Sequence, residues 1–167
     1  LLRASNSLLN WPTTLTDGQW LDREEFNLIT SKIESESTTT TLLLGVPGSG
    51  KSALLSRLAQ ELRAKAVTIL AIKADLLSAE ITTVEQLMKS LNLPANPIYC
   101  LAVLSKLESV VLIVDQLDAL ADMVDLRSQR LNVLLDLIHD LAGLPNVHVV
   151  ASCRDFEHQH DPRLRNL

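Results

Sequence analysis

Residues 45–52, which read GVPGSGKS, constrain this chain more than any other stretch, because they fit the spacing G-x-x-x-x-G-K-S in full. Glycines in such a loop let successive backbone N–H groups curve around the oxygens of a phosphate group. A helix that starts directly after the loop adds the positive end of its dipole. In this pattern Lys51 reaches the β- and γ-phosphates, and the Ser52 hydroxyl is a ligand of Mg²⁺. The sequence therefore predicts a nucleotide phosphate site formed by Gly45, Val46, Pro47, Gly48, Ser49, Gly50, Lys51, Ser52 and Ala53.

Apolar and β-branched runs on either side of this loop predict strands that alternate with helices. The strands are expected at 38–44, 67–72, 110–114 and 147–152. Helices are expected after a cap at Asp22, over 51–65, after the capping box Thr82-x-x-Glu85, from the Asn96-Pro97 pair to Leu107, and over 131–141. Such alternation is typical of an α/β fold in which helices cover both faces of a parallel sheet. Residues 1–21 are expected to be irregular, and residues 156–167 to form a polar tail.

Acidic side chains follow the strand expected at 110–114, at the sheet edge where ligands of parallel sheets bind. Asp115 is placed to hold Mg²⁺ opposite Ser52, directly or through water. Asp118 is placed to orient or deprotonate an attacking water molecule. Many nucleotide hydrolases carry Glu directly after the metal-binding Asp, whereas this chain has Gln116. Either Asp118 therefore serves as the base, or hydrolysis is slow.

Arg154 follows the strand expected at 147–152 and is a third candidate site residue. An arginine at this position can sense the γ-phosphate or stabilise the charge that is transferred. The alternative is a surface ion pair with Asp155 or Asp161. Cys153 has no recognisable His or Asn partner, so a buried and inert thiol is expected.

Several other residues have chemistry that would suit a nucleotide site but are more simply explained by packing or solvation. They are Trp11 and Trp20 as rings that stack on adenine, Arg127 and Arg130 as groups that act on a neighbouring subunit's nucleotide, and His158, His160 and Asp161 as metal ligands.

Composition excludes several classes of function. The chain has 167 residues, of which 47% are hydrophobic and 21% charged, which suits one ordinary core and excludes a disordered chain. A net charge of −5 and only 3% aromatic residues disfavour direct contact with nucleic acid. Two cysteines give no disulfide framework, and no apolar run approaches the ~20 residues that cross a membrane. Because the first residue is Leu rather than Met, a piece of a larger protein is expected. A cytoplasmic location fits these features together.

The segments GVPGSGKS, VVLIVDQLDAL and VHVVASCRD together resemble the P-loop ATPases that have an additional central strand. Within these the chain is most similar to the STAND/NACHT group, and next to the AAA-type ATPases. The second motif of these families is matched by Asp115, Leu117 and Asp118, but a small residue is usual where Gln116 stands and Glu where Ala119 stands. The third motif ends in a polar-polar-Arg run that Ser152-Cys153-Arg154 matches, and Asp22-Arg23-Glu24-Glu25 resembles the Arg-Glu entry to the helix before the loop.

The resemblance covers residues 20–156 and implies a strand order and a domain arrangement. The strand at 147–152 would lie between the first strand and the strand at 110–114. A fifth strand and a helical lid would normally follow. The chain is accordingly interpreted as an N-terminal irregular segment, 1–21, and a P-loop ATPase core, 22–167, that is incomplete at its C-terminus.

The function that this resemblance favours is an ATP-driven regulatory switch in signal transduction. ATP and Mg²⁺ bind, the domain changes its contacts with other domains of the chain or forms a homo-oligomer, and slow hydrolysis resets it. ATP is expected rather than GTP, because no N-K-x-D motif follows the acidic strand. Three alternatives stay open: an AAA-type remodeller or loader, a small-molecule kinase, and a nucleotide-binding scaffold that does not hydrolyse. No direct contact with nucleic acid or membrane is expected of this segment.

Overall fold

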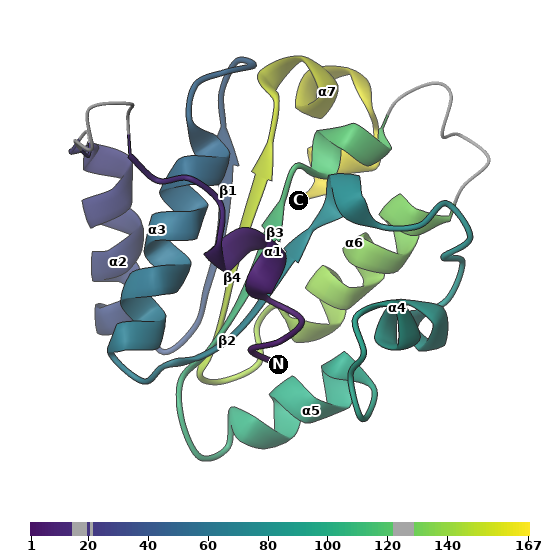
Figure 1. The fold of residues 1–167 in the computed structure, drawn as a ribbon, viewed down its shortest axis with the longest axis horizontal. Coiled ribbons are helices and arrows are strands. Elements are labelled where there is room, and N and C mark those ends of the chain that lie inside the picture. Colours follow the sequence, from purple (N-terminus) through teal and green to yellow (C-terminus); the bar gives the residue numbers. More distant parts are fainter. Residues whose placement is uncertain (15–19, 21, 122–128) are drawn as a thin grey trace.

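The computed structural model describes residues 1–14, 20, 22–121 and 129–167. Within this part of the chain, four strands form one parallel sheet in the order β1-β4-β3-β2 (Figure 1). The strands are β1 Thr39–Leu44, β2 Thr68–Lys73, β3 Val110–Asp115 and β4 Val147–Cys153. The structure confirms the predicted α/β fold, its four strands, and the position of β4 between β1 and β3.

The register of the strands brings their carboxyl ends to a common edge of the sheet. Leu44 lies beside Cys153, and Lys73 lies beside Asp115. Because each chain segment leaves the sheet at the same edge, the loop at 45–50 meets the turns that follow β3 and β4. This edge is where ligands of parallel α/β sheets bind.

Helices cover both faces of the sheet (Figure 1). On one face lie α1 Asn6–Leu9, α2 Glu24–Ser35 and α3 Lys51–Ala64, and on the other α4 Val84–Ser90, α5 Pro97–Leu104 and α6 Arg130–Leu141. Val111 and Ile113 of β3 pack in the core on the face covered by α1, α2 and α3, and Leu112 and Val114 pack in the core on the face covered by α4, α5 and α6. Burial on both faces explains why β3 is an unbroken apolar run. No helix in the described ranges is long and apolar enough to cross a membrane.

Two predicted helix starts are wrong by one residue. The N-cap of α4 is Thr83 rather than Thr82, and the Thr83 hydroxyl accepts from the Gln86 backbone N–H at 3.3 Å. The Gln86 side chain in turn accepts from the Thr82 backbone N–H at 2.7 Å. Two adjacent threonines fit the capping pattern, and only the structure distinguishes them. Helix α2 likewise begins after Arg23 rather than after Asp22.

The prediction that residues 1–21 are irregular is wrong for their first part. Leu8 and Leu9 of α1 are buried in the core that α1 shares with α3. The Ser5 hydroxyl accepts from the Ala71 backbone N–H at 2.9 Å and so satisfies a donor of the edge strand β2. The expected polar tail also forms structure, namely α7 Asp155–His160 and a 3-10 turn at Leu164–Asn166. Both ends of the chain therefore contribute to the folded domain.

His148 in the middle of the sheet makes stability depend on pH. The ring is 1% exposed, its Nδ1 lies 3.0 Å from the Thr39 hydroxyl, and burial lowers its pKa. The unfolded chain therefore binds a proton more readily than the folded one, so the free energy of unfolding falls as the pH drops below the unfolded pKa of about 6.5. We expect His148 to contribute a slope of at most about 1.4 kcal/mol per pH unit in urea unfolding. His148→Gln should flatten the curve, and an unchanged slope in that variant would contradict the assignment.

Candidate nucleotide site

The loop between β1 and α3 lines a cavity of about 280 Å³ at the carboxyl ends of the strands. Gly48 and Gly50 have φ angles of 77° and 82°, a region that residues with a Cβ atom rarely adopt. The backbone therefore favours glycine at Gly50, which belongs to the pattern, and at Gly48, which stands at one of its variable positions. Helix α3 begins at Lys51, so its N-terminus forms part of the wall. The cavity is lined by Trp11, Pro47, Gly48, Ser49, Gly50, Lys51, Ser52, Ala53, Gln116, Asp118 and Arg154.

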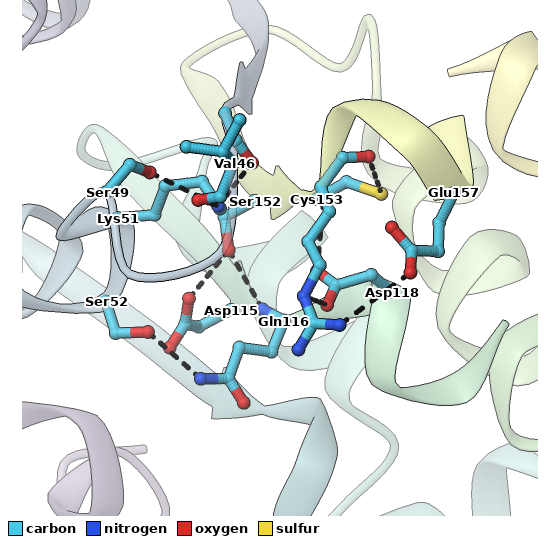
Figure 2. A network of polar contacts seen from close by, with 12 residues as sticks. Val46, Ser49, Lys51, Ser52, Asp115, Gln116, Asp118, Ser152, Cys153 and Glu157 are labelled. Atoms are coloured by element: carbon cyan, nitrogen blue, oxygen red, sulfur yellow. Dashed lines mark hydrogen bonds and ion pairs between the residues drawn. The ribbon is translucent and has the colours of Figure 1, made fainter. Parts of the chain in front are cut away.

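Lys51 lies across the loop, and carbonyl groups of the loop hold its ammonium group (Figure 2). Nζ donates to the carbonyl oxygen of Gly45 at 2.7 Å and to that of Val46 at 3.1 Å. These two residues thus contact Lys51, while the other seven predicted loop residues line the cavity. A lysine beside the N-terminus of a helix provides the positive potential that binds an anion.

Arg23, which precedes α2, holds the outer side of the loop. Its guanidinium group donates to the Ser49 carbonyl at 2.7 Å and pairs with Glu25 at 3.3 Å. A Cβ atom on Gly50 would lie 3.2 Å from Arg23 Nη1, so a side chain there would press against this contact. The Arg-Glu segment that the resemblance singled out therefore supports the loop.

Asp115, which the sequence predicts to hold Mg²⁺ opposite Ser52 directly or through water, binds groups of the protein itself in the structure. Asp115 is fully buried and does not line the cavity. Its Oδ1 accepts from the Ser152 hydroxyl at 2.6 Å, and its Oδ2 accepts from the ammonium group of Lys73 at 3.1 Å. A buried carboxylate is stable only when such partners balance it, and here the neighbouring strands supply them.

Gln116, which follows Asp115, lines the cavity and contacts Ser52. Its backbone is left-handed, with φ at 62°, and its N–H donates to the Ser152 hydroxyl at 2.9 Å. The side-chain amide lies 3.2 Å from the Ser52 hydroxyl (Figure 2). With the amide oxygen turned toward Ser52, the amide nitrogen donates to both carboxylate oxygens of Asp75, each at 3.1 Å. Gln116 then bridges α3 and the end of β2.

Asp118 and Arg154 come together on the cavity wall. Arg154 Nε lies 2.9 Å from Asp118 Oδ2, and the Arg154 backbone N–H donates to Asp118 Oδ1 at 3.1 Å. Asp118 is 5% exposed, and burial raises its pKa even though Arg154 acts to lower it. The Arg154 side chain is about half exposed. Arg154 therefore has room to move, whereas Asp118 is fixed.

Cys153 is buried next to this pair. Burial is the main cause that raises the pKa of its thiol to about 12, and the nearby charge of Asp118 adds to the effect. A thiol with such a pKa stays protonated at neutral pH and is a poor nucleophile. This agrees with the buried, inert cysteine that the sequence predicted.

Of the two tryptophans, only Trp11 lines the cavity. Its ring centre lies 4.1 Å from Nζ of Lys73. Trp20 contacts Phe26 edge to face instead, with ring centres 5.9 Å apart. The packing interpretation therefore holds for Trp20, while Trp11 belongs to the site.

Of the remaining weak candidates, those that the structure describes do not line the cavity. Arg130 donates to the carbonyl of Leu77 at 2.6 Å, and Arg127 lies outside the described residues. Residues 158–161 form no metal centre, because no three His, Cys, Asp or Glu side chains gather suitably anywhere in the described ranges.

Lys73 and Asp75 are site residues that the sequence reasoning missed. The run TILAIK ends an otherwise apolar strand on a charged residue, and an acidic residue follows two positions later. That departure from the apolar pattern is the signal that could have identified them. Lys73 is 2% exposed, so its charge needs a partner, and Asp115 is the one across the strand pair.

The strand order, the glycine loop and the residues around it define a P-loop ATPase fold of the AAA type. Residues 41–166 match the ATPase family associated with various cellular activities (AAA), and the chain belongs to this family. Comparison with curated proteins gives no match.

Solved structures share the fold. The Walker-type ATPase PABY2304 of Pyrococcus abyssi matches with 22% identity and a TM-score of 0.57, over 87% of this chain and 49% of that protein. AMPPCP-bound DnaA from Aquifex aeolicus matches with 16% identity and a TM-score of 0.54, over 86% of this chain and 43% of that one. A DNA replication initiation factor matches with 18% identity and a TM-score of 0.51, over 99% of this chain and 48% of that one. The chain thus spans less than half the length of these structures, and the likeness concerns the fold alone.

Proposed function

We propose that this chain binds ATP in the loop cavity, hydrolyses it slowly, and acts as a regulatory switch within a larger protein. The observation that carries this proposal is the cavity wall, where the loop, the start of α3, Lys51 and Arg154 face one space. This wall offers backbone donors and two cations to a chain of phosphate groups. Membership of the AAA family supports the proposal, as do the related folds of DnaA structures that hold AMPPCP.

In this proposal each group on the wall has a defined role. The amides of the loop and Lys51 bind the β- and γ-phosphates, and Lys51 exchanges its carbonyl contacts for charge-assisted bonds to phosphate oxygens. Arg154 leaves Asp118 for the γ-phosphate, which exposes a carboxylate oxygen to water. Asp118 then accepts a proton from the attacking water, a step that its raised pKa assists.

The expected Mg²⁺ ligands, Ser52 and Asp115, do not fit as a pair. Ser52 lines the cavity, but the Asp115 carboxylate is buried, and its two oxygens accept from Ser152 and Lys73. The neutral amide of Gln116 contacts Ser52 in its place. No step of the proposed reaction is therefore assigned to a metal ion held by Asp115.

Asp118→Asn tests the proposed base. We expect ATP hydrolysis to fall by about 100-fold, because the variant keeps the shape of the carboxyl group but not its basicity. The melting temperature should rise by about 2–4 °C for each kcal/mol gained, since a buried charge with a raised pKa is removed. Phosphate release and calorimetry measure the two effects, with Asp136→Asn on the exposed side of α6 as the control. Wild-type hydrolysis in Asp118→Asn would exclude Asp118 as the base.

A nucleotide-binding scaffold without hydrolysis is the second candidate. The observation that favours it is the engagement of both Asp115 and Asp118 in ion pairs. Phosphate release at several protein concentrations separates the candidates. Phosphate release that equals the background of Lys51→Ala supports the scaffold. A release rate per protein molecule that does not depend on protein concentration supports the switch. A release rate per molecule that rises with protein concentration supports an AAA-type remodeller or loader.

We further propose the partners of this segment. They are ATP, other domains of the same chain, and a second copy in a nucleotide-dependent homo-oligomer. Direct contact with nucleic acid or membrane is not proposed, because the net charge is −5. A cytoplasmic location is proposed, since Cys100 and Cys153 are both free thiols, as in a reducing compartment.

A further inference from the structure

Lys73 lies between two carboxylates beneath the nucleotide cavity. Its side chain is fully buried, and Nζ lies 3.1 Å from Asp115 Oδ2 and 3.4 Å from Asp75 Oδ1. The ring of Trp11 covers the ammonium group, with the ring centre 4.1 Å from Nζ. The two carboxylates and the aromatic ring each attract the ammonium group, so together they fix its position.

This ammonium group supplies the positive charge that Asp115 requires. The other oxygen of Asp115 accepts from Ser152 at 2.6 Å, so protein groups engage both oxygens. A metal ion bound directly to Asp115 would lie close to the charge of Lys73 in a poorly solvated place, where like charges repel strongly. The carboxylate therefore has one buried cation already and little capacity for a second.

Gln116 completes this arrangement on the side of the loop. Its backbone N–H donates to the same Ser152 hydroxyl that binds Asp115, and its amide contacts Ser52 and Asp75. The residue that contacts the Ser52 hydroxyl is thus neutral, while the carboxylate oxygens of Asp115 accept from Lys73 and Ser152.

We propose that Lys73 is the resident counter-ion of Asp115 and occupies the carboxylate oxygen that a Mg²⁺ ion would otherwise use. As a consequence, the Asp115 carboxylate does not contribute to the Mg²⁺ dependence of nucleotide binding. This inference rests on the proposed ATP site but concerns residues below it. Lys73 is a positioning residue here, because it acts on the site through Asp115 and Gln116.

Titration calorimetry with ATP, in Mg²⁺ and in EDTA, tests the consequence. The ratio of Kd in EDTA to Kd in Mg²⁺ measures how strongly Mg²⁺ promotes ATP binding. We expect this ratio in Asp115→Asn to stay within about 2-fold of the wild-type ratio, as in the control Asp136→Asn. In Lys73→Gln, which keeps an amide donor for Asp115 but removes the charge, the ratio should rise by about 10-fold. A ratio in Asp115→Asn about 10-fold below that of the wild type would overturn the proposal.

Thermal unfolding with Mg²⁺ alone keeps the inference separate from the proposed ATP site. We expect Mg²⁺ to leave the melting temperature of the wild type unchanged, to raise that of Lys73→Gln, and to leave that of Lys73→Gln/Asp115→Asn unchanged. If this pattern appears while neither the wild type nor any variant binds ATP, the proposed function is wrong but the pairing of Lys73 with Asp115 is supported. A wild type that Mg²⁺ stabilises through Asp115, or a Lys73→Gln variant that it does not stabilise, overturns the role of Lys73.

Discussion

Replacing Lys51 with alanine should weaken ATP binding by about 100-fold, which corresponds to about 2.7 kcal/mol. Lys51 is the only lysine among the described residues that line the cavity. It lies on the first turn of α3, where the dipole of the helix also favours an anion. The loss of one charge-assisted contact to a phosphate group therefore removes a large part of the binding free energy.

The matched control for this experiment is Lys65→Ala at the other end of α3. Lys65 is exposed and pairs with Glu34 and Glu61, so its removal changes the net charge equally without touching the cavity. Titration calorimetry should show wild-type affinity for Lys65→Ala. Equal affinities of Lys51→Ala and Lys65→Ala would mean that ATP does not bind at the loop.

Lys73→Met should lower the free energy of unfolding by about 3–5 kcal/mol, because it leaves the Asp115 carboxylate buried without its cation. Asp115→Asn should also destabilise, since it leaves Lys73 with only Asp75. The free energy of unfolding of the double variant should fall by much less than the sum of the two single losses, because the double variant has neither the Lys73 nor the Asp115 charge.

Urea unfolding of the four proteins measures this coupling. Lys73→Gln serves as a milder replacement, since its amide still donates to Asp115. Losses that add within about 0.5 kcal/mol would show that the two side chains do not form an energetic pair.

Local patterns in the sequence predicted the parts of the molecule that local chemistry determines. The loop at 45–52 follows from its glycine spacing, since Gly48 and Gly50 need positive φ angles. The strand β3 follows from its unbroken apolar run, because the sheet is covered on both faces. The order of the strands came from the resemblance to P-loop ATPases, and the structure confirms it.

Contacts between distant residues were not predictable in this way. Lys73 meets Asp115 only because the register of β2 and β3 aligns them, and a pattern along one strand does not contain that register. Lys73 engages the Asp115 carboxylate and Gln116 contacts Ser52, and neither contact follows from the pattern of the acidic strand end. The pairing of Asp118 with Arg154 similarly depends on two turns that follow different strands.

The N-terminal helix escaped prediction for a different reason. Helix α1 has four residues, too few for a helical period to show in the sequence. Its place is fixed by contacts with the rest of the fold, such as the Ser56 hydroxyl that donates to the Trp11 carbonyl at 3.0 Å. These contacts bring Trp11 to the cavity and to Lys73.

Hydrogen–deuterium exchange with and without ATP tests the central claim most directly, because it locates the ligand on the chain. The account predicts slower exchange of the backbone amides of residues 45–53 when ATP is present. A second cavity at the opposite end of the sheet, lined in part by Arg3, Arg63 and Asn92, serves as the internal comparison. Unchanged exchange at 45–53, with protection at this second cavity instead, would contradict the account.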